Sequence, residues 1–262
     1  MGKEDKSREG HGGCGKGALY VVGIGPGGLG HLTERAREVL ASAEWVVGYA
    51  RYLELVSPLT RGKETFSTGM TGEVERCRKA IELASSGRSV AVVSSGDAGI
   101  YGMAGLLLEL MGDGEVPFGV EVVPGVPAFA AAAAVLGAPL MHDFASVSLS
   151  DLLTPWETIE RRVEAAASGD FVIVLYNPKS KKRTAQLPGA VDIIRRYREP
   201  STPVGVVRNA SRDDEEVRVT TLGGVESFYD TVDMSTLLVI GNSTTYTAAG
   251  RMVTPRGYGV GK

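Results

Sequence analysis

Residues 18–28, ALYVVGIGPGG, decide the fold class of this chain of 262 residues. The first six residues are mostly apolar, which is typical of a buried strand, and a glycine-rich turn follows them at once. Such a turn after a buried strand is where an α/β sheet brings its backbone close to a ligand. The stretch therefore predicts an α/β protein with a binding loop after its first strand.

The rest of the chain repeats this pattern, because short runs rich in Val, Ile and Leu alternate with helical stretches. The pattern predicts largely parallel sheets in two α/β domains, residues 18–138 and 139–257. The expected strands are 18–23, 45–48, 64–66, 89–93, 120–123, 145–149, 171–176, 203–207, 217–221 and 236–240. The expected helices include 33–42, 72–85 and 128–137.

The sequence also allows three local predictions, for a helix start, for the C-terminal stretch and for Cys77. A helix is expected after Thr154, with Thr154 as the cap, Pro155 at the first helical position and Glu157 closing a capping box. The final stretch 250–262, GRMVTPRGYGVGK, is expected to be irregular. Cys77 falls on the apolar face of the helix 72–85 and is expected to be a core thiol.

Composition excludes several classes of protein. The net charge is −3 and the pI about 5.8, so no overall basic field favours nucleic acid or an anionic membrane. Two widely spaced cysteines indicate neither a disulfide framework nor a metal site, which fits the cytoplasm. No apolar run approaches a membrane span. Residues 1–17, including His11 and Cys14, are expected to form a disordered tail.

The glycines of GIGPGG match the dinucleotide fingerprint GxGxxG, but two residues argue against it. Pro26 removes a backbone N–H from the loop that would hold a pyrophosphate. The next strand ends in Gly48 and Tyr49, where an acidic residue should bind the ribose. A nicotinamide or flavin cofactor is therefore disfavoured, and a glycine-rich turn without a ligand remains an alternative.

Two further loops follow strands of the same half. The loop SSGDAGIYGMAG, residues 94–105, exposes backbone around Gly96, and Asp97 lies at the tip of the strand. The loop PGVPAF, residues 124–129, enters an alanine-rich helix. Three such loops on one sheet edge indicate a shared ligand.

The ordered set of these loops with VLYNP, VVRNAS and LLVIG resembles the tetrapyrrole methylases over residues 18–257. The segments GYARYL, HDFASVSLSDLLTPWE, LYNPKSKKR and RMVTPRGY are most similar to the branch that methylates precorrin-3B, or cobalt-factor III, at carbon 17 with ring contraction. The resemblance implies a homodimer that binds S-adenosylmethionine in the cleft between two domains, beside an anionic tetrapyrrole, and releases S-adenosylhomocysteine. The residues that it places at the cofactor are Pro26, Ser95, Gly96, Asp97, Ile100, Tyr101, Pro127, Ala128, Asn177 and Ala210.

Two departures limit what the resemblance carries over. Related uroporphyrinogen methylases have a proposed acidic base where this chain has Tyr49, so that assignment does not transfer. They also usually have Met at the position of Asn177.

Methyl transfer needs little beyond alignment of the methyl group with the ring carbon, since a sulfonium methyl is already activated. The three histidines show no metal-ligand spacing. Ring contraction needs proton movement, for which His142 and Asp143 are candidates; a simple turn capped by Asp143 is the alternative.

Cations should meet the carboxylates of the substrate. Lys179, Arg183 and Arg208 follow two strands of the second half and are the candidates, although the lysines of NPKSKKR also suit a solvated surface. Other precorrin methylases, a diphthine synthase and a noncatalytic S-adenosylmethionine-binding module remain alternatives. The sequence leaves open whether the substrate carries cobalt.

Overall fold

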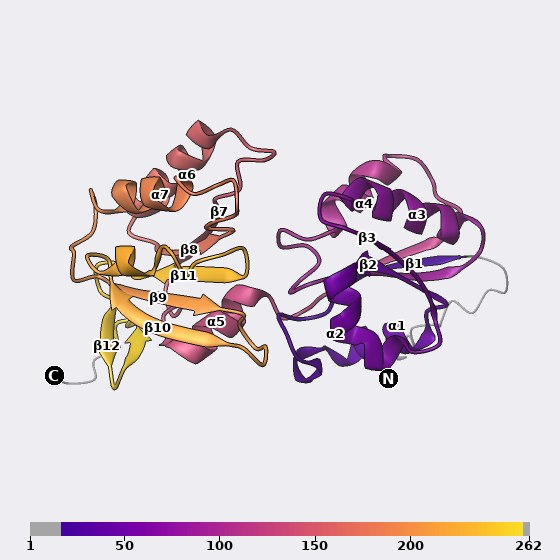
Figure 1. The fold of residues 1–262 in the computed structure, drawn as a ribbon, viewed down its shortest axis with the longest axis horizontal. Helices are drawn as coiled ribbons and strands as arrows, with labels where there is room; N and C mark the ends of the chain where they lie inside the picture. The colour runs from indigo at the N-terminus through magenta and orange to yellow at the C-terminus, as the bar shows by residue number, and fades with distance from the viewer. Residues whose placement is uncertain (1–16, 259–262) are drawn as a thin grey trace, which may run out of the picture. The chain divides into compact units, whose positions relative to one another are not determined.

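The computed structural model describes residues 17–258, and Figure 1 shows their fold. The predicted tail, with His11 and Cys14, lies outside the described residues except for Gly17. By its internal packing the chain divides into two units. Among the described residues, the first comprises 17–22, 34–94 and 103–123, and the second comprises 23–33, 95–102 and 124–258.

The first unit is a five-stranded sheet in the order β3-β2-β4-β1-β5. The pairs β1–β5, β2–β3 and β2–β4 are parallel, as predicted. In Figure 1, α1 and α2 lie on one side of the sheet and α3 and α4 on the other. Its elements are β1 (Ala18–Gly23), α1 (Glu34–Ser42), β2 (Trp45–Tyr49), α2 (Ala50–Thr60), β3 (Glu64–Thr68), α3 (Glu73–Ser85), β4 (Ser89–Ser94), α4 (Ala104–Met111) and β5 (Gly119–Val123).

The second unit is built on a sheet in the order β10-β9-β11-β8-β7. Only β7 and β8 pair in parallel, and β11 runs antiparallel to both β8 and β9. The prediction of a largely parallel sheet is therefore wrong here. The elements are η1 (Leu29–His31), α5 (Ala128–Leu136), β6 (Gly137–Ala138), β7 (Phe144–Ser148), α6 (Trp156–Ser168), β8 (Val172–Tyr176), α7 (Gln186–Ile194), β9 (Pro203–Arg208), β10 (Glu216–Thr221), η2 (Val225–Phe228), β11 (Thr236–Ile240), β12 (Tyr246–Ala248) and β13 (Arg251–Val253).

Alternate residues of β8 enter two cores. Ile173 and Leu175 pack with α6 and α7, whereas Val172 and Val174 pack with α5 on the other face (Figure 1). Because α5 covers the second sheet, the segment from Pro124 packs with the second unit, as do residues 23–33 and 95–102. A Cβ at Gly205 would lie 2.4 Å from Leu136 Cδ1, so β9 needs glycine where α5 crosses it.

Two local predictions are wrong. The helix α6 begins at Trp156, and Pro155 is its N-cap with an extended backbone (φ −54°, ψ 140°) and no side-chain capping bond. Thr154 therefore does not cap it. Within the stretch expected to be irregular, β13 pairs with β12 and with β6, and residues 259–262 lie outside the described part.

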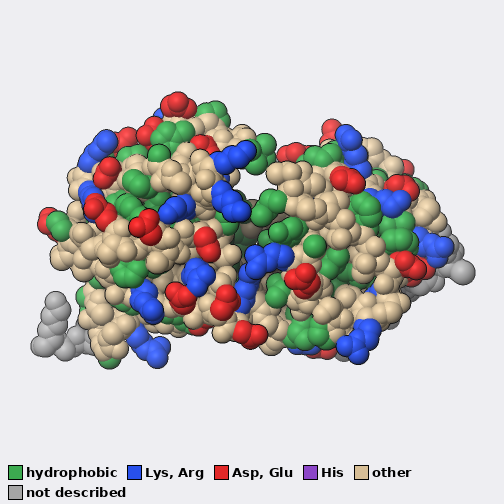
Figure 2. Space-filling model, in the orientation of Figure 1, with side chains coloured by type: hydrophobic (Ala, Val, Ile, Leu, Met, Phe, Trp, Pro, Cys, Tyr) green, Lys and Arg blue, Asp and Glu red, His purple; other side chains and the backbone are tan. Residues whose placement is uncertain are grey.

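The expectation for Cys77 is confirmed, since this side chain is fully buried and burial raises its pKa to about 11. No helix within residues 17–258 is long and apolar enough to cross a membrane. On the face shown in Figure 2, basic and acidic side chains are interspersed over each unit.

Candidate functional site

The predicted glycine loops meet within the second unit. Gly25 and Gly96 exchange two backbone hydrogen bonds, of 3.0 and 2.7 Å, which join the loop after β1 to the loop after β4. A Cβ on Gly125 would lie 2.2 Å from the carbonyl oxygen of Gly96 and 2.8 Å from Gly23 Cα. Three loops approach this closely only because these positions lack side chains.

Asp97 holds two of these loops together. Its carboxylate accepts the backbone N–H of Gly99 at 2.8 Å and that of Gly125 at 2.9 Å. Ser95, directly before Gly96, is half-buried. Asp97 therefore shapes the site through its neighbours' backbone.

Gly96 faces the start of α5. A Cβ there would meet Ala128 N at 3.5 Å and Pro127 Cα at 3.8 Å, which are ordinary van der Waals contacts, so the bare backbone of Gly96 lies close to the start of α5. Pro127 is the N-cap of α5. The N–H of Ala128 makes no hydrogen bond within residues 17–258, so it remains available to an acceptor on a ligand.

Two tyrosines form one wall of this region. Tyr101 has a left-handed backbone (φ 53°), and its hydroxyl donates to the carbonyl of Ser146 at 3.0 Å. Its ring lies 5.0 Å from that of Tyr176, whose oxygen accepts the N–H of Phe129 at 3.0 Å. Burial raises the pKa of Tyr176 to about 12. Ile100, beside Tyr101, is exposed.

Asn177 follows β8 in a left-handed conformation (φ 51°), and its amide donates to Ser148 Oγ at 2.9 Å. Its carbonyl accepts Nη2 of Arg183 at 2.9 Å, and Arg183 Nη1 donates to Ser150 Oγ at 3.3 Å. Arg183 is buried, and burial lowers its pKa. The structure thus turns Arg183 inward, onto the segment that carries Asn177.

The segments that carry Pro26 and Ala210 are joined by contacts of the residues next to them. The sequence did not predict that these neighbouring residues join the two segments. The carbonyl of Pro26 accepts Nε of Arg212 at 3.0 Å, and Gly28 N–H donates to Ser211 at 2.9 Å. A Cβ on Gly27 would lie 2.0 Å from the Ser211 oxygen. The adjacent glycines of GPGG were the signal for such a close contact.

The other predicted cations already have partners. Lys179 Nζ donates to the carbonyl of Tyr229 at 2.6 Å. Arg208 forms an ion pair with Glu216 and lies 3.9 Å from Asp233, and the Glu216 carboxylate raises the pKa of Arg208.

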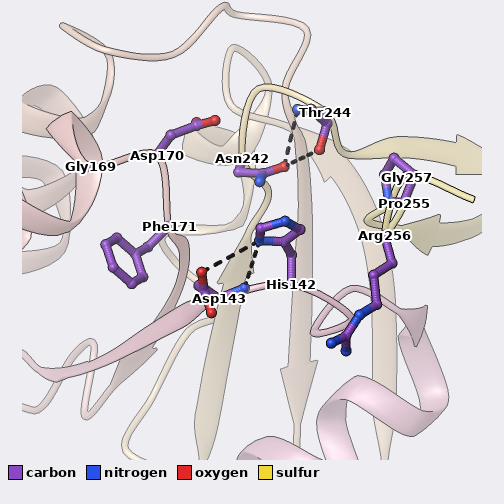
Figure 3. Close-up of a pocket in the computed structure, with 10 residues that line it drawn as sticks. All are labelled: His142, Asp143, Gly169, Asp170, Phe171, Asn242, Thr244, Pro255, Arg256 and Gly257. Carbon is purple, nitrogen blue, oxygen red and sulfur yellow. Dashed lines mark hydrogen bonds and ion pairs between the residues drawn. The ribbon is translucent and has the colours of Figure 1, made fainter.

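His142 and Asp143 belong to a different region, the pocket shown in Figure 3. They precede β7, whereas Ser148 ends β7 and Asn177 follows the parallel strand β8, so the strand length of roughly 16 Å separates the two groups. Both residues line a pocket of about 400 Å³ with Asn242 and Arg256. The structure therefore does not bring this pair to the glycine loops.

His142 Nδ1 accepts the N–H of Asp143 at 2.9 Å and lies 3.7 Å from its Oδ2. No group of three His, Cys, Asp or Glu side chains suited to a metal occurs among the described residues.

Comparison with known proteins identifies the family. Residues 18–226 match the model for Tetrapyrrole (Corrin/Porphyrin) Methylases. A probable cobalt-factor III C(17)-methyltransferase of Salmonella typhimurium is 52% identical over 92% of this chain and 99% of its own length.

Solved structures agree. The methyltransferase CobJ superposes with a TM-score of 0.86 at 35% identity, covering 92% of this chain and all of that one. Uroporphyrin-III C-methyltransferase of Thermus thermophilus, solved with S-adenosylhomocysteine, has a TM-score of 0.65 at 26% identity, covering 86% and 92%. This chain belongs to the tetrapyrrole methylase family.

Proposed function

We propose that this protein is an S-adenosylmethionine-dependent C-methyltransferase of cobalamin biosynthesis that methylates cobalt-factor III at carbon 17 with ring contraction. The observation that carries the proposal is the match at 52% identity along nearly the whole of a relative named for that reaction. Precorrin-3B, the form without cobalt, is the alternative substrate within the same branch.

The glycine loops suit this cofactor. The bare backbone of Gly96 and the free N–H of Ala128 offer a polar nucleoside a close backbone approach and a hydrogen-bond donor. Tyr101 and Asn177 border the same region, so we place the cofactor among Pro26, the loop 95–101, Pro127, Ala128, Asn177 and Ala210. When bound, S-adenosylmethionine supplies an activated methyl group.

The chain's own residues would then align and shield the reacting centres. The bonds of Asp97 and the Gly25–Gly96 pair hold the loops in position before a ligand arrives. Alignment of the methyl group with the ring carbon can itself contribute up to about 7–11 kcal/mol in favourable cases. We assign no acid or base role to His142 and Asp143, because they lie at the opposite sheet edge. We further propose that the protein acts as a homodimer in the cytoplasm.

Anaerobic turnover tests the proposal. Purified protein is given S-adenosylmethionine with cobalt-factor III, precorrin-3B, precorrin-2 or precorrin-4, and mass spectrometry counts the methyl groups added. We expect one methyl group on cobalt-factor III. Methylation of precorrin-2 or precorrin-4 alone would move the protein to another branch of the family.

Calorimetry separates the remaining alternatives. S-adenosylhomocysteine should bind and NAD should not, because Pro26 and Tyr49 are unsuited to a dinucleotide. Binding of S-adenosylhomocysteine without turnover of any tetrapyrrole would instead indicate a noncatalytic module.

A further inference from the structure

Two adjacent leucines project from the loop between β7 and α6. Leu152 is 74% exposed and Leu153 is 94% exposed. The loop is fixed on both sides of them: the carboxylate of Asp151 accepts the amide of Gln186 at 2.7 Å, and Pro155 is the N-cap of α6. The fold thus presents the two side chains to the surroundings between two anchored points, and contiguous exposed apolar side chains commonly mark a binding surface.

Two cations lie on the neighbouring loop. Lys181 and Lys182 are exposed and form no ion pair or hydrogen bond within residues 17–258. Arg183, next in the chain, reaches Ser150, so the lysine loop runs beside the leucine loop. Lys179 and Arg183 from the same segment are turned inward, which leaves Lys181 and Lys182 as its free charges.

Both loops leave the same edge of the second sheet, the one formed by the carboxyl ends of β7 and β8. β7 and β8 pair in parallel up to Ser148 and Tyr176, and one loop follows each strand. Asn177, which we place at the cofactor, begins the lysine loop. An apolar tip and two free cations therefore stand at the edge that carries the proposed methyl-transfer site.

We propose that Leu152, Leu153, Lys181 and Lys182 form a docking rim for the tetrapyrrole, an inference that rests on the proposed function. The leucines cover part of an apolar face of the macrocycle, and the ammonium groups meet carboxylates at its periphery. A planar ligand with apolar faces and an anionic edge has the chemistry that matches both halves of the rim. The lysine loop thereby contributes to substrate choice through residues other than the inward-facing Arg183.

Two double variants test the rim: L152S/L153S and K181A/K182A. All four side chains are exposed, so both variants should fold. L152S/L153S should raise the KM for cobalt-factor III about ten-fold, because the lost apolar burial weakens substrate binding. K181A/K182A should raise it about five-fold at low salt, and this difference should shrink at high salt as charges are screened.

Neither variant should change the affinity for S-adenosylhomocysteine. Leu108→Ser and Arg162→Ala, at exposed positions of α4 and α6, are the matched controls and should leave the KM unchanged. An active wild type together with an unchanged KM in both double variants would overturn the rim while leaving the proposed function intact. A change in oligomeric mass of L152S/L153S, measured by sedimentation, would overturn it too, because the leucines would then join copies of this chain. Absence of wild-type turnover on any tetrapyrrole would remove the proposed function and the rim together.

Discussion

Gly96 combines a left-handed backbone (φ +68°) with a close approach to the start of α5, where a Cβ would meet Ala128 N at 3.5 Å. Replacement by Val should abolish binding of S-adenosylhomocysteine, because a β-branched residue is strained at this φ and its methyl groups would cover the backbone that we place at the cofactor. Isothermal calorimetry measures the loss, and circular dichroism verifies the fold.

Gly62→Val is the matched control for this experiment. Gly62 also has a positive φ (+81°), but a Cβ there would meet nothing within 4 Å. This variant bears similar strain and should bind the ligand normally. Equal affinity in a folded Gly96→Val protein would show that the loop 95–102 does not hold the cofactor.

Arg183 was expected from the sequence to bind the substrate, and the structure instead directs it to the carbonyl of Asn177. Arg183→Ala should therefore weaken S-adenosylhomocysteine binding about ten-fold, equivalent to about 1.4 kcal/mol, because the loop carrying Asn177 loses its support. Arg183→Lys keeps the charge but cannot make both bonds, so it should recover only part of the affinity. Normal cofactor affinity combined with weak tetrapyrrole binding would restore the original expectation.

The residue type predicted the glycine loops better than it predicted the role of Arg183. A basic residue directly after a strand indicates a positive charge near a ligand. The amino-acid sequence does not say whether that side chain points into the protein or toward solvent. The glycine loops were more predictable, since their tight approach depends on missing side chains at Gly25, Gly96 and Gly125.

At the scale of elements, the strands were predictable and their directions were not. β11, Thr236–Ile240, matches its predicted span, because a short apolar run bounded by polar residues is a strong strand signal. A strand buried on both faces shows the same continuous apolar run whether its neighbours are parallel or antiparallel, so the mixed second sheet was missed. β13 was missed because three residues are too short a pattern.

The turn between α6 and β8 allows a test of pH dependence. Burial acts to raise the pKa of Asp170, but hydrogen bonds from Ser243 and the charge of Arg198 outweigh it, so the pKa is lowered. Arg198 Nη2 lies 3.1 Å from this carboxylate, and its side chain is only 4% exposed. A lowered folded-state pKa stabilises the fold above the ordinary value near 3.8, and this contribution is lost as the pH falls through the lowered pKa.

Asp170→Asn should therefore cost about 1 kcal/mol at pH 7, a modest value because the partly exposed carboxylate is screened by water. Urea unfolding at pH 7 and at several acidic values measures the difference, which should shrink as the pH falls below about 3.8. Asp213 is exposed, so Asp213→Asn is the control and should change the free energy of unfolding little. A constant difference at every pH would contradict the ionic origin.

At the scale of the whole molecule, the two edges of the second sheet that lie at opposite ends of β7 and β8 should have different functions. His142 and Asp143 lie at the edge opposite Asn177, so His142→Ala and Asp143→Ala should retain methyl transfer and ring contraction at near wild-type rates. Mass spectrometry and the visible spectrum of the product report the two events separately. Loss of contraction with methylation preserved would return this pair to the catalytic site.

The position of the new methyl group tests the proposed reaction most directly. The protein is incubated anaerobically with cobalt-factor III and S-adenosylmethionine carrying a carbon-13-labelled methyl, and the product is examined by NMR. We expect a single labelled methyl on carbon 17 of a ring-contracted macrocycle. A labelled methyl on another carbon, or no transfer to cobalt-factor III or precorrin-3B, would contradict it.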